Sequence, residues 1–114
     1  MTGYDDLLKL SADLGKASHE VTRKAQLVVT KTAHDIEADA KSFAPVDTGM
    51  LRNSISTTIG AGGLSAEIGP TVDYAHYLEY GTRRMPPQPY MGPAAERRAE
   101  PFVKAIESLG GEFL

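Results

Sequence analysis

The longest unbroken pattern in this sequence lies before Pro45, the first proline in the chain. Small and apolar residues recur there at three- and four-residue spacing, the spacing of one helix face: Val21, Ala25, Val28, Thr32, Ile36, Ala40 and Phe43. We predict a helix over residues 4–43, with Gly15 as a candidate boundary between a short first helix and a long second one. Residues 18–42 alone would span about 37 Å. A helix this long in so small a chain favours packing against another molecule.

Pro45 ends the helix, because the residue before a proline is pushed out of the α region. Alternating β-branched and polar residues then occupy 54–60 and 64–70, on either side of the glycine-rich turn 61–63. This pattern predicts a β-hairpin over residues 54–70.

Residues 72–82 fit two structures. A strand would place Tyr74, His76, Leu78 and Tyr80 on one face, whereas a short helical turn would be capped by Asp73 and Gly81; we favour the helical turn. Residues 83–93 contain four prolines and predict a stiff, extended arm. Helical spacing returns over 94–109, where Pro101 either kinks the helix or starts it afresh. Together these elements predict one α+β domain over residues 1–114, with a small antiparallel sheet covered on one face.

Composition narrows the classes of function. The 114 residues include no cysteine, which excludes disulfides and thiolate chemistry and suits a reducing cytoplasm. No apolar run is long enough to span a membrane, and the N-terminal residues lack the features of a secretory signal. A net charge of −3 argues against a dedicated nucleic-acid binder.

Asp47-Thr48-Gly49 is the triplet that carries the catalytic carboxylate in aspartic proteases. A dimeric protease would need two such carboxylates side by side, each delivered by an apolar strand. Here a predicted helix precedes the triplet, so the protease is a remote alternative. The structural interpretation is that Asp47 accepts backbone hydrogen bonds and caps a short turn, with Arg52 within reach of its carboxylate.

The histidines lack helical zinc-site spacing, and we expect no catalytic residue, cofactor or metal.

Three motifs, taken in order, resemble one family. They are "APVDTGMLRNSI" at 44–55, "DYAHYLEYGT" at 73–82 and "MPPQPYMGPA" at 85–94. This order is similar to the neck, or tail-completion, family of long-tailed double-stranded DNA phages and prophages, named after gene ten of a lambdoid siphovirus. The motif residues to which the resemblance gives a structural or assembly role are Pro45, Asp47, Thr48, Gly49, Leu51, Arg52, Tyr74, Tyr77, Glu79, Gly81, Pro87, Pro89 and Tyr90.

The resemblance implies a structural virion protein with no enzymatic activity, assembled in the host bacterial cytoplasm. Its members form a ring at the head–tail junction, with a hexamer favoured and a dodecamer as the other expectation. Implied partners are further copies and the neighbouring head-completion (stopper) and tail-terminator proteins. Genomic DNA would pass through the lumen without sequence-specific binding, and no membrane is involved. A tail terminator or minor tail component is the alternative. Two further expectations are that the proline arm contacts a neighbouring subunit and that Glu79 pairs with Arg83, Arg84 or Arg52.

Overall fold

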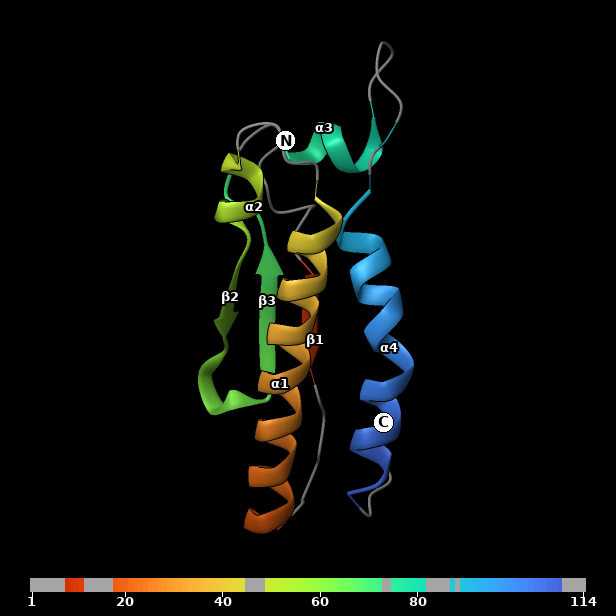
Figure 1. Ribbon diagram of the computed structural model, residues 1–114. Helices are drawn as coiled ribbons and strands as arrows, with labels where there is room; N and C mark the ends of the chain where they lie inside the picture. The colour runs from red at the N-terminus through yellow and green to blue at the C-terminus, as the bar shows by residue number, and fades with distance from the viewer. Residues whose placement is uncertain are drawn as a thin grey trace.

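The computed structural model describes residues 8–11, 18–44, 49–72, 75–81, 87 and 89–109. In chain order, the elements are strand β1 (Leu8–Ser11), helix α1 (His19–Phe43), helix α2 (Met50–Ser54), strand β2 (Ser56–Ile59), a 3-10 turn (Ala61–Gly63), strand β3 (Ser65–Gly69), helix α3 (Ala75–Tyr80) and helix α4 (Met91–Glu107). Figure 1 shows α1 packed against the sheet and α4 running alongside α1. The predicted α+β class is confirmed.

The long helix α1 has clear signals at both ends. It begins after Ser18, whose hydroxyl oxygen accepts a hydrogen bond from the Val21 N–H at 3.2 Å. It ends after Phe43, where the extended Ala44 donates its N–H to the Ala40 carbonyl at 2.9 Å. The 25-residue helix lies where the spacing predicts it.

The predicted helix over 4–43 is wrong at its beginning, because residues 8–11 form strand β1. β1 pairs antiparallel with β3, so that Leu8 faces Ile68 and Leu10 faces Ala66 in the register. The four-residue sequence Leu-Lys-Leu-Ser of β1 is compatible, taken by itself, with either a helix or a strand. Pairing with a strand more than fifty residues away decides between them.

The sheet has the order β1-β3-β2, and both pairings are antiparallel. In the central strand Ala66 and Ile68 are buried, while Glu67 between them is exposed. The sheet therefore has one face in the core and one polar face, as predicted. The hairpin is also present, but β2 begins at Ser56 rather than residue 54, because α2 extends through Ser54 and Ile55 caps it.

The second half of the chain is more helical than predicted. α3 confirms the helical interpretation of residues 72–82, and Gly81 after it has a φ of 79°. α4 begins at Met91, so the last part of the predicted arm over 83–93 belongs to a helix. Pro93 lies in the first turn of α4, where backbone N–H groups have no partner within the helix. A proline, which has no N–H group, therefore removes no helical hydrogen bond there. The helix also continues through Pro101, which is exposed.

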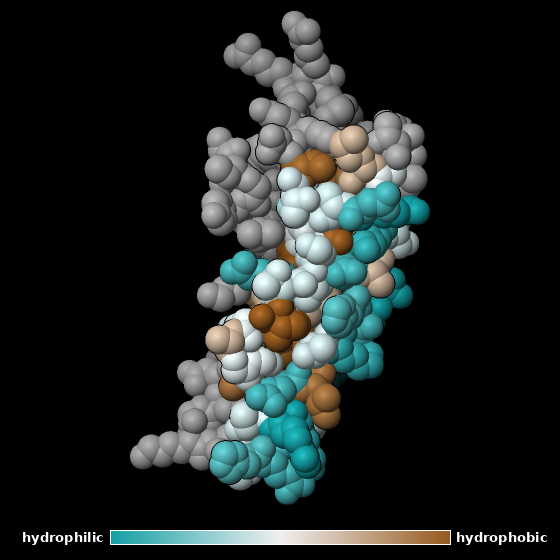
Figure 2. Space-filling view, turned by 90° about the vertical axis from the view of Figure 1, so that its left-hand side faces the viewer, coloured by the Kyte–Doolittle hydropathy of each residue, from teal (hydrophilic) through white to brown (hydrophobic). Residues whose placement is uncertain are grey.

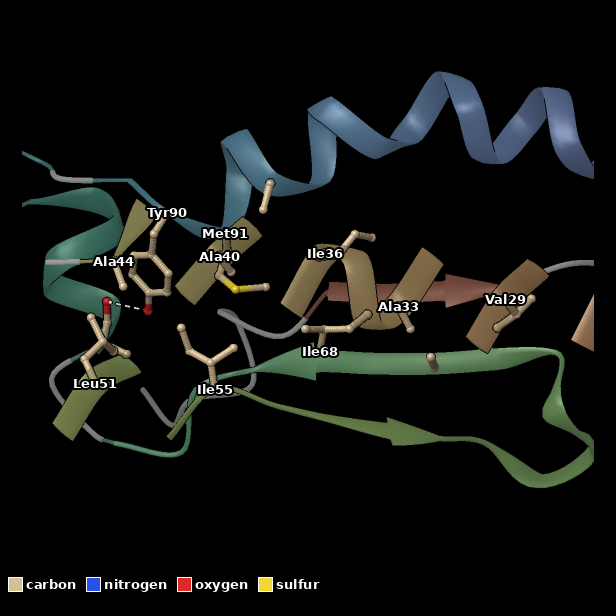
Figure 3. Packing of buried hydrophobic residues seen from close by; sticks show 13 residues of the cluster. Val29, Ala33, Ile36, Ala40, Ala44, Leu51, Ile55, Ile68, Tyr90 and Met91 are labelled. Atoms are coloured by element: carbon tan, nitrogen blue, oxygen red, sulfur yellow. Dashed lines mark hydrogen bonds between the residues drawn. The ribbon is translucent and has the colours of Figure 1, made fainter. Parts of the chain in front are cut away.

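The core is built on small side chains. Helix α1 contributes Ala25, Val29, Ala33, Ile36 and Ala40 to the buried set, and Tyr90 is the largest fully buried side chain of the described residues. Figure 3 shows this core running from Val29 at one end to Leu51 and Tyr90 at the other. The molecule is elongated, with extents of 51 × 23 × 22 Å.

Candidate functional site: the junction of α2, α3 and α4

The first motif fastens the end of α1 to the start of the sheet. Gly49 adopts a left-handed φ of 78° at the residue before α2, a conformation that disfavours a side chain. Leu51 is buried in the core. The Arg52 Nε donates a hydrogen bond to the Lys41 carbonyl oxygen at 3.0 Å, near the C-terminus of α1, where orphan carbonyls and the helix dipole favour a cation. Pro45, Asp47 and Thr48 lie outside the described residues, so the capping role of Asp47 stays a prediction.

Ser54 extends this connection. Its hydroxyl donates to the Leu51 carbonyl oxygen at 2.8 Å and accepts from the Thr71 N–H at 3.3 Å. The next residue, Ile55, is buried in the core. The motif thus ties α1, α2 and the segment after β3 together.

Glu79 at the end of α3 binds the N-terminus of α4. Its Oε1 atom accepts from the N–H groups of Tyr90 at 3.2 Å and Met91 at 2.9 Å, and Oε2 accepts from the Gly92 N–H at 3.2 Å. These are donors that a helix leaves without intrahelical partners, and the helix dipole favours a negative charge there. A carboxylate from one helix therefore caps another helix.

Gly92 makes room for this cap. A Cβ atom built on Gly92 would lie 3.3 Å from the Oε2 atom of Glu79. The second motif supplies the carboxylate and the third supplies the donors, so the two motifs complete one structural unit. The expected pairing of Glu79 with Arg83, Arg84 or Arg52, within or between subunits, stays a prediction. Arg52 donates to a carbonyl of α1, and Arg83 and Arg84 lie outside the described residues.

Tyr90 fills the centre of the junction. Its ring is fully buried, and its hydroxyl lies 3.5 Å from the Ala75 carbonyl oxygen, a long hydrogen bond marked by the dashed line in Figure 3. The same view places the ring near Ala44 and Leu51.

Pro87 and Pro89, which precede Tyr90, are exposed. Tyr74 and Thr82 lie outside the described residues, as does the side chain of Tyr77.

An ion cluster that the sequence analysis missed joins α1 to α4. Asp39 is buried and accepts from Arg98 twice, at 2.6 Å from Nε and 3.2 Å from Nη2, while Arg97 Nη1 lies 3.6 Å away. Asp35 is 3.8 Å from Arg98. The hydrogen bonds from Arg98 hold the pKa of the Asp39 carboxyl below its usual value, against an opposing effect of burial. One signal was present in the sequence: Asp39 interrupts the apolar face of α1 next to Ala40.

In the described residues, these arrangements position the backbone at helix ends. Within the described residues, no three His, Asp or Glu side chains are grouped to hold a metal ion. Helices α1 and α2 flank the D-T-G triplet in the described chain, so the triplet follows a helix rather than a strand. None of the described helices combines the length and hydrophobicity that crossing a membrane requires.

Fold and site together define a small α+β domain in which Arg52, Glu79 and Tyr90 of the motifs link its helices to one another. Residues 9–81 match the model of the family described as "Bacteriophage HK97-gp10, putative tail-component". Because the match covers more than half of the chain, the protein belongs to this family and is a structural component of a phage virion. The third motif, at 85–94, lies beyond the matched residues. No curated protein and no solved structure matches the chain.

Proposed function

We propose that this protein forms a ring in the phage neck, joins the DNA-filled head to the tail and lines the channel through which DNA leaves. In this proposal it is not an enzyme, and its localisation in the virion is the head–tail junction. The observation that carries the proposal is family membership, combined with the complete set of three motifs in neck-family order.

The use of the motif residues supports a scaffold role. Arg52 and Glu79, the charged motif residues whose contacts are described, both bind backbone groups at helix ends. Charged side chains used in this way hold the shape of the subunit. A shape held at the end of α1 and at the start of α4 suits a subunit that must stack with others in a fixed geometry.

The proposed partners are further copies of this chain, in a hexamer or alternatively a dodecamer, and the stopper and tail-terminator proteins on either side. A lumen that lets DNA slide must avoid fixing phosphates, and the net charge of −3 agrees with such a lumen.

A tail terminator or minor tail component is the second candidate, and the family description as a tail component favours it. Electron microscopy of the purified protein and of the assembled virion separates the two by position. A ring between the stopper and the tail terminator is the expected result. Density for this protein as the terminator ring that ends the tail itself, in the tail tube or at the distal tail would overturn the neck assignment. A peptide-cleavage assay on the wild type and on Asp47→Asn checks the remote protease alternative, and we expect no cleavage by either.

A further inference from the structure

One long segment of the chain carries no charge. From Asn53 to Ala66 the sequence has no Asp, Glu, Lys, Arg or His, although charged residues make up 24% of the chain. This run is not hidden in the core: Ser56, Thr58 and Ile59 of β2 are exposed, as are Ala61 and Gly62 in the turn. Figure 2 looks at the side of the molecule on which β2 lies, where a band of pale and brown residues runs down the middle and strongly hydrophilic residues lie along its right-hand margin and at its lower end. Depletion of charge is what distinguishes the centre of a protein interface.

The same side presents a free strand edge. β2 is an outer strand of the sheet and lies at the left-hand margin of Figure 1. The Gly60 N–H donates to the Ser65 carbonyl at 2.8 Å, so this pair is hydrogen-bonded within the hairpin. Bonded and non-bonded pairs alternate along an antiparallel ladder, so Thr58 and Ser56 also turn their backbone groups toward β3. Thr57 and Ile59 therefore turn their N–H and C=O groups outward.

This edge lacks most of the features that keep exposed strands from pairing. Natural proteins protect such edges with charged side chains, prolines or bulges, and β2 has none of the three, although it is short. The edge is also held in place, because the Gln26 side-chain amide donates to the Gly62 carbonyl oxygen at 2.7 Å. A pre-ordered edge loses little conformational freedom when it is bound.

The chain exposes more surface than a compact monomer of its mass. The chain exposes 7320 Å², whereas a compact monomer of its mass, 12.2 kDa, would expose about 6,100 Å². The radius of gyration of 15.4 Å likewise exceeds the roughly 13 Å expected for this length. The excess of about 1,200 Å² is of the same order as the roughly 800 Å² that one partner loses in a typical stable complex, so a contact with a second copy would bring the exposed area close to that of a compact protein. A small chain with this excess is suited to covering itself with further copies.

We propose that the β2 edge and the following turn form a contact with a second copy of this chain, made through the outward N–H and C=O groups of Thr57 and Ile59. The inference deepens the proposed function by naming the surface that one subunit offers to the next. A ring requires contacts between two different surfaces, and this edge is one of them.

The test compares Thr58→Lys with Thr58→Val and Ala38→Lys by sedimentation velocity at several protein concentrations. Thr58 is exposed and lies opposite Glu67 in the register, so a lysine there is compatible with the folded subunit. A lysine on the edge strand would be desolvated in the contact, and we expect it to weaken association roughly tenfold or more. Valine keeps the position uncharged, and Ala38 is an exposed residue of α1 that receives the same charge. Both controls should assemble like the wild type.

Amide hydrogen exchange adds a readout that does not depend on assembly size. In assembled wild-type protein, the amides of Ser56, Thr57, Thr58 and Ile59 should all be protected. In Thr58→Lys, the outward amides at 57 and 59 should exchange fast while those at 56 and 58 stay protected, which also shows that the hairpin is intact.

Association of Thr58→Lys equal to that of the wild type would overturn the edge contact and leave the ring proposal standing. So would equal loss of association in Ala38→Lys. A wild type that stays monomeric at every concentration would overturn the edge contact and the ring together.

Discussion

Removing the carboxylate of Glu79 tests the central feature of the junction. Two of its three hydrogen bonds, to the N–H groups of Tyr90 and Met91, are partly buried, and the third, to Gly92, is exposed. We assign about 1 kcal/mol to each partly buried bond and about 0.5 kcal/mol to the interaction with the helix dipole. Glu79→Ala should therefore lower the free energy of unfolding by about 2–3 kcal/mol.

Glu79→Gln separates the contribution of geometry from that of charge. Glutamine keeps one acceptor oxygen near the N–H groups but loses the negative charge and the second acceptor. We expect a loss of about 1 kcal/mol, which places Gln between the wild type and Ala. Glu100→Ala is the matched control, because Glu100 lies on the exposed surface of α4 and pairs only with Lys104 at the next turn in the described structure. Its cost should be a few tenths of a kcal/mol.

Urea unfolding followed by circular dichroism measures all three variants. Protein concentration must be held constant, because assembly adds to apparent stability. If Glu79→Ala cost no more than Glu100→Ala, the capping role of Glu79 would be refuted. If Gln were as damaging as Ala, the backbone hydrogen bonds would not be the source of the effect.

Two further predictions concern α1 and α2. The pKa of Asp39 is lowered in the folded protein, so its ion pair with Arg98 stabilises the fold above pH of about 4 and loses this effect as the pH falls through the folded pKa. Thermal melts of Asp39→Asn should thus fall below the wild type at pH 7 and converge with it in acid; a gap that stays constant with pH would contradict the assignment. Gly49→Ala should destabilise by about 1 kcal/mol because φ is positive there, and Gly49→Asn by less, since asparagine tolerates this conformation better. Equal melting temperatures for the two would contradict the backbone argument.

The parts of the fold that follow from local sequence could be predicted. Helix α1 has a Ser18 cap, a sustained apolar face and Pro45 after it, and all three signals are within the segment itself. The hairpin turn is equally local. In contrast, β1 depends on pairing with β3, and nothing within residues 8–11 distinguishes a strand from a helix.

The candidate site divides in the same way. The motifs identified Glu79 and Arg52 as important, but suggested a side-chain partner for each. In the described residues both bind backbone groups at helix ends, and sequence spacing does not show where a helix end lies in space. Asp39 and Arg98 are 59 residues apart, and only the packing of α4 on α1 brings them together.

The contact of Glu79 with α4 also has a consequence for sequence change. It fixes both ends of residues 80–89 to one carboxylate, so this segment begins and ends at the same place on the molecule. Lengthening a segment whose ends are already joined costs little, about 0.6 kcal/mol for each doubling. We expect insertions after Gly81 and before Pro89 to leave α3, α4 and the contact between them in place.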